Sequence, residues 1–157
     1  MSERSGVWLV IVGALVAGCG PSSPYRGRSA AELERMLDDA DPTVQTQGAL
    51  GLAHLGAEGG AAAPKLVAAL KSSHALVRQN AALALGKVEP DAATAVPALI
   101  DALSDPEWAV RRQAALSLGE LGPPAKSALP ALERLGRDQQ ARVRQAAQMA
   151  VGKIKGR

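Results

Sequence analysis

The chain has 157 residues, of which 47% are hydrophobic and 21% are charged, and its formal net charge is +3. It contains no Phe, one Tyr and two Trp, so Ala, Leu and Val must form almost the whole core. The length fits one domain, and the small net charge and the scarcity of aromatic side chains argue against nucleic-acid binding. Ala and Leu are strong helix formers, so the composition favours an all-α fold.

Residues 1–18 have the features of a secretory signal peptide. A short polar segment precedes ten consecutive apolar residues, VWLVIVGALV, at positions 7–16. That run is about half as long as a membrane-spanning helix requires, and small residues follow it where a signal peptidase would cut. The only cysteine of the chain, Cys19, comes directly after Val16-Ala17-Gly18.

These four residues resemble the lipobox of bacterial lipoproteins, in which the cysteine becomes the lipidated N-terminus. The resemblance implies a lipid anchor at Cys19 and a place in the bacterial cell envelope, on the periplasmic side. Gly20 follows the cysteine in place of Asp, which favours the outer membrane. An ordinary secretory signal and a poor membrane anchor, each with an incidental cysteine, are the alternatives. Residues 19–28 are rich in Gly, Pro and Ser and predict a flexible tether.

Residues 29–157 carry a gapless 33-residue repeat, which we divide into units at about 29–61, 62–94, 95–127 and 128–157. Such a period is typical of stacked supersecondary units. Its clearest column is a valine, at Val44, Val77, Val110 and Val143, and a leucine column precedes it, at Leu33, Leu66, Leu99 and Leu132.

Each unit predicts two helices. A proline is expected in the opening turn of the first helix, where its missing N–H is harmless, at Pro64, Pro97 and Pro130. Repeat one instead has Ser29 followed by Glu32, a capping-box pattern. The second helix is expected to begin near a recurring Asp or Ser, and Gly56 and Gly122 stand where a left-handed C-cap would end it.

The repeat resembles HEAT repeats of the short type found in phycobilisome lyases, most clearly in the segment DPEWAVRRQAALSLG at 105–119. The resemblance covers residues 29–157 and implies an α-solenoid of about four helical hairpins, with the second helices lining the concave side. Gln45 replaces an arginine in repeat one, and Gly136 replaces a leucine in repeat four. Both changes fall in terminal repeats, which are usually atypical because one face lacks a neighbour.

An arginine follows the valine in three repeats, and an acidic or hydroxyl residue lies five positions before the valine. One hypothesis is a basic ladder for an acidic partner or a phosphate. The alternative, which we favour, is a structural Arg–Asp bridge at each turn, because a planar guanidinium satisfies carboxylates and carbonyls well. The residues of this column are Asp39, Arg78, Asp105, Arg111, Asp138 and Arg144.

A second candidate surface lies six positions after the valine, where an apolar column points away from the main apolar stripe. With the column two positions after the valine, it predicts an apolar groove with a polar margin, suited to a peptide or a helix of a protein partner. Burial of these leucines between adjacent second helices is the alternative. The surface comprises Thr46, Leu50, Gln79, Leu83, Arg112, Leu116, Gln145 and Met149.

Charge is unevenly distributed along the repeats. Residues 29–63 hold six acidic and one basic side chain, whereas residues 128–157 hold seven basic and two acidic ones. Head-to-tail association, contact of the basic end with anionic lipid, and an ordinary solvated surface are all compatible with this pattern.

Enzymatic functions have little support. The hydroxylases of the HEAT family bind di-iron through His-Glu pairs, but neither His54 nor His74 is followed by Glu, and they occupy different repeat positions. No metal, cofactor or small-molecule substrate is therefore expected. We predict a non-enzymatic scaffold that holds a protein partner on its concave face. A protein related to the lyases or hydroxylases and a purely structural spacer are the alternatives.

Overall fold

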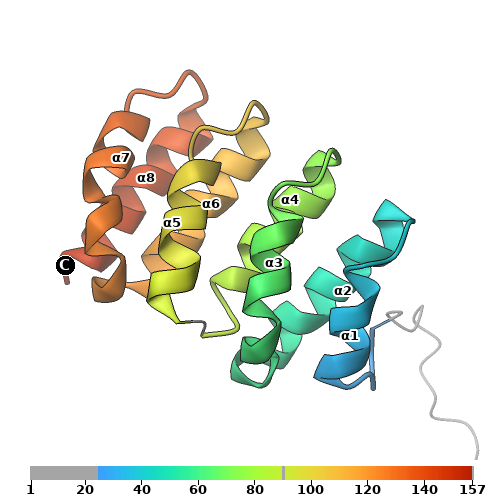
Figure 1. Ribbon diagram of the computed structural model, residues 1–157. Coiled ribbons are helices and arrows are strands. Elements are labelled where there is room, and N and C mark those ends of the chain that lie inside the picture. Colours follow the sequence, from blue (N-terminus) through green and yellow to red (C-terminus); the bar gives the residue numbers. More distant parts are fainter. Residues whose placement is uncertain (1–24, 90, 157) are drawn as a thin grey trace, which may run out of the picture.

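The computed structural model describes residues 25–89 and 91–156, and within these ranges every regular element is a helix. Helix pairs stack in one row from the N-terminal to the C-terminal side (Figure 1). The first helices lie in front in this view and the second helices lie behind them. The pairs are α1 (Ala30–Met36) with α2 (Pro42–Leu55), α3 (Ala63–Ala69) with α4 (Ala75–Leu85), α5 (Ala92–Ala102) with α6 (Trp108–Leu121), and α7 (Leu129–Leu135) with α8 (Ala141–Ile154).

Side-chain caps start several of these helices. The Ser29 hydroxyl accepts a hydrogen bond from the Glu32 amide at 3.4 Å, and the Glu32 carboxylate accepts one from the Ser29 amide at 2.8 Å, which confirms the capping box. The Asp41 carboxylate accepts from the amide of Thr43 at the start of α2. Caps of this kind satisfy amides that have no partner within the helix.

The first helices open in two different ways. Short 3₁₀ segments, η1 (Gly56–Ala62) and η2 (Pro123–Ala128), precede α3 and α7, and Pro64 and Pro130 then occupy the opening turn. In repeat three α5 begins at Ala92 and Pro97 lies inside it, so the expected position of this proline is wrong. Residues 91–96 contain no Gly or Pro and Asp91 caps the helix, so this stretch is helical before the proline is reached.

Two glycines end second helices with positive φ but outside the left-handed helical region. Gly56 has φ 59° and ψ −132°, and Gly122 has φ 65° and ψ −139°. The prediction of a glycine-specific end is confirmed, whereas the left-handed helical geometry is wrong. A residue with a Cβ rarely adopts this backbone, so glycine is needed to turn the chain into the 3₁₀ segment.

The second helices pack on one another at each junction more extensively than the first helices do. Small side chains permit this approach: a Cβ placed on Gly86 would lie 2.8 Å from the Ser117 side chain, and one on Gly119 would lie 3.0 Å from the Ala150 Cα. The buried Ser117 hydroxyl donates across the junction to the Ala82 carbonyl at 2.7 Å. Closer packing of this row is the arrangement expected when second helices lie on the inner side of a solenoid.

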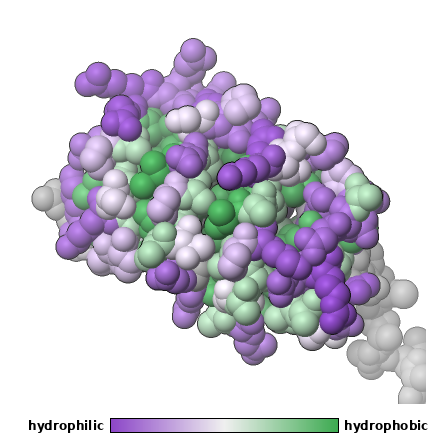
Figure 2. All heavy atoms as spheres, in the orientation of Figure 1, coloured by the Kyte–Doolittle hydropathy of each residue, from purple (hydrophilic) through white to green (hydrophobic). Residues whose placement is uncertain are grey.

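The first-helix side of the molecule carries hydrophilic side chains over most of its area, with hydrophobic atoms showing between them (Figure 2). Among residues 25–89 and 91–156, no helix combines the length and apolar character needed to cross a lipid bilayer.

Candidate functional site

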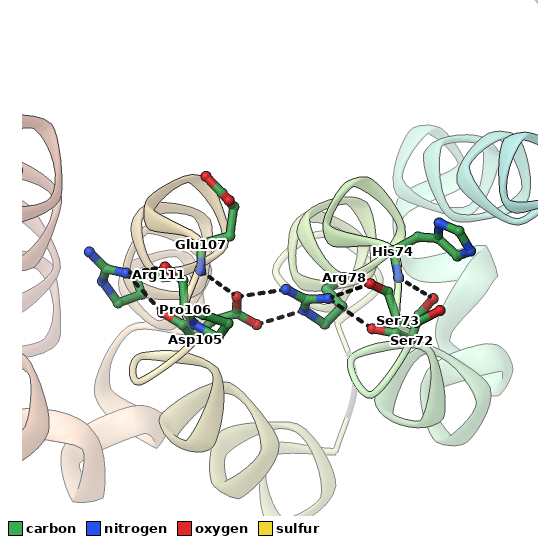
Figure 3. A network of polar contacts seen from close by, with 8 residues as sticks. All are labelled: Ser72, Ser73, His74, Arg78, Asp105, Pro106, Glu107 and Arg111. Atoms are coloured by element: carbon green, nitrogen blue, oxygen red, sulfur yellow. Dashed lines mark hydrogen bonds and ion pairs between the residues drawn. The ribbon is translucent and has the colours of Figure 1, made fainter.

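Arg78, in the first turn of α4, joins repeat two to repeat three. Its Nε and Nη2 donate to the two carboxylate oxygens of Asp105 at 2.7 and 2.8 Å, forming a bidentate pair. Its Nη1 donates to the carbonyls of Ser72 and Ser73 at 2.9 and 3.2 Å (Figure 3). One guanidinium therefore closes the turn of its own repeat and holds the turn of the next.

Arg111 repeats this arrangement one junction later. Its Nε and Nη2 donate to the Asp138 carboxylate at 2.8 and 3.1 Å, and its Nη1 donates to the carbonyls of Asp105 and Pro106. In both pairs the side chains are mostly buried, the arginines being 13% and 17% exposed and the aspartates 8% and 9%. Such pairs are stronger than fully exposed ion pairs, because solvent screens them less.

The aspartates of these pairs are also held by their own backbone. Asp105 Oδ1 accepts from the Glu107 amide, and Asp138 Oδ1 accepts from the Gln140 amide, each at 2.8 Å. The hydrogen bond from Arg111 is the main reason that the pKa of Asp138 lies below its usual value. Burial raises the pKa of Asp105, but the hydrogen bonds from Arg78 and from the Glu107 amide outweigh it, so that the pKa is lowered.

The first and last members of the Arg–Asp column, Asp39 and Arg144, keep the contacts within their own turns but have no partner in another described repeat. Arg144 Nη1 donates to the carbonyls of Asp138 and Gln139 at 2.9 and 3.0 Å, as in the inner repeats. At the other end Asp39 Oδ1 accepts from the Asp41 amide at 2.8 Å, again as in the inner repeats. Within the described part of the chain, no ion pair is formed by Arg144 or by Asp39.

The junction between repeats one and two lacks the bridge. Gln45 takes the arginine position and donates to the Asp39 carbonyl at 2.7 Å, which preserves the turn contact alone. Ser72 takes the aspartate position, and its hydroxyl accepts from the His74 amide at 3.2 Å. Gln45 and Ser72 occupy the two positions that would form one bridge, so both partners are changed at this junction. Both residues stand in the repeat columns of the sequence, but that they face each other at one junction was not expected.

A different ion pair links these first two repeats. Lys65 of α3 contacts Asp38 at 2.7 Å and Glu34 at 3.5 Å. The hydrogen bond that Lys65 Nζ donates to the Asp38 carboxylate is the main cause that raises the pKa of Lys65. A cavity of about 430 Å³ lies here, lined by Gln45, Lys65, Ser72 and neighbouring residues. A smaller cavity, of about 230 Å³, lies at the equivalent positions of the bridged junction between repeats three and four.

The predicted groove residues differ in exposure along the second helices. Thr46 is buried, whereas Gln145 and Met149 are exposed, and Met149 retains half of its accessible surface. The remaining members are half-buried, and Leu116 packs against the core. These half-buried members are Leu50, Gln79, Leu83, Arg112 and Leu116.

Leu76 extends this surface and was missed by the sequence analysis. It lies seven residues before Leu83, which places both on one side of α4. Leu76 is 59% exposed and Met149 is 50% exposed, and these are the large hydrophobic side chains that stand out as exposed in the described residues. Both belong to second helices. We call the apolar row Leu50, Leu76, Leu83, Leu116 and Met149 the second-helix row.

The aromatic and histidine residues in the described part of the chain do not form one cluster. Tyr25 stacks on His54 with ring centroids 5.1 Å apart, and the Arg142 guanidinium lies 5.9 Å from the Trp108 ring. His74 is exposed before α4. In the part of the chain that the structure describes, no group of three or more His, Cys, Asp or Glu is placed to hold a metal ion. The predicted signal peptide, Cys19 and most of the tether lie outside the described residues.

Comparison with known proteins identifies relatives of this architecture. The family model for HEAT repeats matches residues 29–96 and 63–152. An engineered protein is 25% identical, with a TM-score of 0.69, and the match covers 81% of this chain and 62% of that one. Human deoxyhypusine hydroxylase, solved in complex with glycerol, is 27% identical with a TM-score of 0.67, covering 88% and 47%.

The complex of CpcE and CpcF of phycocyanin lyase from Nostoc sp. PCC7120 is 23% identical, with a TM-score of 0.62, and the match covers 93% of this chain and 70% of that chain. This likeness shows the shared fold. The chain spans less than two thirds of the engineered protein and about half of the hydroxylase. Comparison with curated protein sequences gives no significant match.

Proposed function

Since the chain belongs to the HEAT-repeat family, we propose that it is a non-enzymatic scaffold that binds a protein partner along the second-helix row. Repeat arrays present extended surfaces of this kind, and their function resides in the side chains that line them. The partner we infer is an amphipathic helix or an extended peptide with apolar anchors.

One observation carries this proposal: Leu76 and Met149, two large hydrophobic side chains on second helices, are 59% and 50% exposed. Leu83, on the same helix as Leu76, and Leu116, on α6 between α4 and α8, are half-buried. Gln79, on the same helix as Leu76, and Arg112 supply polar groups beside the apolar row. Apolar side chains flanked by polar ones are typical of a peptide-binding surface.

The Arg–Asp bridges are a second argument for the scaffold proposal. Because Arg78 and Arg111 are fully engaged by carboxylates and carbonyls, they are not available to a ligand without breaking the turns. This favours an architectural role for the arginine column over a basic ladder that binds phosphate. Partner recognition then falls to the second-helix row.

Site-specific photocrosslinking in cells that produce the full chain tests the proposed face. Benzoylphenylalanine at Gln79 or Gln145, beside the row, is expected to label one common protein. The same group at Ala68 or Glu133, exposed on first helices, is expected not to label it. Equal labelling from both faces, or no labelled protein from any position, would contradict the proposal.

Substitutions in the row provide the second test. Leu76→Asp and Met149→Asp place a charge on exposed positions, so the fold should persist while the crosslink from Gln79 is lost. Ala68→Asp, exposed on α3, is the matched control and should leave the crosslink unchanged. Unchanged crosslinking in both row variants would favour a spacer without a partner on this face.

We further propose attachment to the bacterial envelope through lipid on Cys19, with the outer membrane favoured. The support is the lipobox-like segment that ends in the chain's only cysteine. Metabolic labelling with a radioactive fatty acid should mark the wild-type protein and not Cys19→Ser. A mature protein that retains residues 1–18, measured by mass spectrometry, would contradict this.

Relationship to the lyases or hydroxylases is the second candidate, favoured only by the named structural relatives. Iron analysis and bilin absorbance of the purified protein distinguish it. Stoichiometric iron or a bound bilin would replace the scaffold proposal.

A further inference from the structure

The two ends of the Arg–Asp column carry complementary halves of the same bridge. Arg144 holds its own turn through Nη1, as Arg78 and Arg111 do. In Arg78 and Arg111, Nε and Nη2 point to the next repeat and bind its aspartate. By the same geometry, we expect Nε and Nη2 of Arg144 to face away from repeat three, and among the described residues no carboxylate pairs with them.

Asp39 is the matching half at the opposite end. Its Oδ1 accepts from the amide two residues on, at 2.8 Å, as Asp105 and Asp138 do. Those two carboxylates receive an arginine from the preceding repeat. Asp39 belongs to the first described repeat, is exposed, and forms no ion pair among the described residues.

Charges around the two halves are also complementary. Asp38, Asp39 and Asp41 crowd the turn of repeat one, and Arg137 and Arg144 lie in or beside the turn of repeat four. Opposite charges on facing surfaces orient an encounter and favour one register. The turns therefore match in shape, because they are repeats of one another, and in charge.

We propose that the chain associates head to tail with a second copy of itself, through a bridge from Arg144 of one copy to Asp39 of the other. The contact lies at the turns and is separate from the second-helix row. Because the two surfaces differ, the contact is heterologous and each added copy leaves both ends open, so that association continues into chains.

The helical surface beside the turn limits the strength of this contact. Gln148 is exposed where the equivalent residues Ala49, Ala82 and Ala115 are fully buried between repeats. The contact therefore lacks the close helix packing of an internal junction. We expect a dissociation constant of about 0.1–1 mM at low salt, weakening as salt screens the charges.

The test uses two substitutions that remove one half of the bridge each and should preserve the fold. Arg144→Gln reproduces Gln45, whose amide keeps the carbonyl contact of its turn, so the fold should be preserved while the donors to the second copy are lost. Asp39→Asn keeps an oxygen for the Asp41 amide and removes the charge. Arg142→Gln is the control, since Arg142 lies over the Trp108 ring of repeat three.

Sedimentation equilibrium of the full chain, from about 10 µM to 1 mM, measures the association. Wild type and Arg142→Gln should grow in average mass with concentration, and each of the other variants alone should associate at least about tenfold more weakly. A mixture of Arg144→Gln with Asp39→Asn should form a dimer and stop there, because only one productive pair of surfaces remains. Circular dichroism checks that all variants are equally helical.

Two results would overturn the proposal. One is a wild-type chain that stays monomeric up to about 1 mM at low salt. The other is association that Arg144→Gln and Asp39→Asn leave unchanged, which would assign it to another surface.

Discussion

Replacing Arg111 by Gln isolates the energetic value of one inter-repeat bridge. The substitution removes two hydrogen bonds to the Asp138 carboxylate and retains the type of turn contact that Gln45 makes in repeat one. Arg144→Gln is the matched control, because it makes the same chemical change in a repeat where no described carboxylate is bound. The difference between the two variants is therefore attributable to the bridge.

The magnitude follows from the burial of the pair. Exposed ion pairs contribute about 0.2–1 kcal/mol, and breaking a buried pair costs about 3–5 kcal/mol. Arg111 is 17% exposed and Asp138 is 9% exposed, which places this pair between those limits. We expect Arg111→Gln to lower the free energy of unfolding by about 2 kcal/mol, and Arg144→Gln by about 0.5 kcal/mol, since only a carbonyl hydrogen bond is weakened.

Urea unfolding followed by circular dichroism at 222 nm, at low micromolar protein, measures both values. The penalty of Arg111→Gln should shrink as pH falls below about 4, because the pKa of Asp138 is lowered in the folded chain and protonation removes the bridge in wild type as well. Equal costs for the two variants, or a penalty that does not change with pH, would refute the reasoning.

Three further changes test other parts of the structure. Gly86→Ala should destabilise the chain by about 1–3 kcal/mol despite the better helix propensity of Ala, because its Cβ would lie 2.8 Å from Ser117; a higher melting temperature would contradict this. Gln45→Arg combined with Ser72→Asp should restore the absent bridge and raise the free energy of unfolding by about 1 kcal/mol, with neither single change sufficient in a double-mutant cycle. Asp105→Asn should flatten the loss of stability in acid: the pKa of Asp105 is lowered in the fold, so its contribution is present above about pH 4 and disappears as pH falls through the folded pKa, which urea titrations at pH 3 and 6 measure.

Much of the fold follows from periodicity. The valine column predicts the buried side of the second helices in repeats two to four, where Val77, Val110 and Val143 are at most 1% exposed, whereas Val44 in repeat one is half-buried. The family comparison and the stacked hairpins confirm the HEAT-like solenoid. A repeat is predictable in this way because every unit must bury the same stripe on its neighbours.

Local exceptions were less predictable. Pro97 lies inside α5 because residues 91–96 extend the helix upstream, and a proline column alone does not reveal where a helix begins. The Ser117–Ala82 hydrogen bond depends on the distance between two helices, which sequence spacing does not determine.

The candidate site was also predictable only in part. The Arg and Asp positions are evident from the repeat, but the direction of each bridge, from one repeat to the next, required the structure. Leu76 was missed because it has no large apolar equivalent in the other repeats, where Thr43, Ala109 and Arg142 take its position. A residue that is confined to one repeat leaves no repeating column in the sequence.

The glycines at the second-helix junctions have a consequence for the curvature of the whole array. Gly86 and Gly119 let adjacent inner helices approach closely, while no such requirement governs the outer row. The ratio of inner to outer spacing determines how sharply a stack of hairpins bends. One methyl group added at either glycine would wedge the inner row apart and straighten the superhelix. We therefore expect the bend of the array to depend on the small side chains at these two sites.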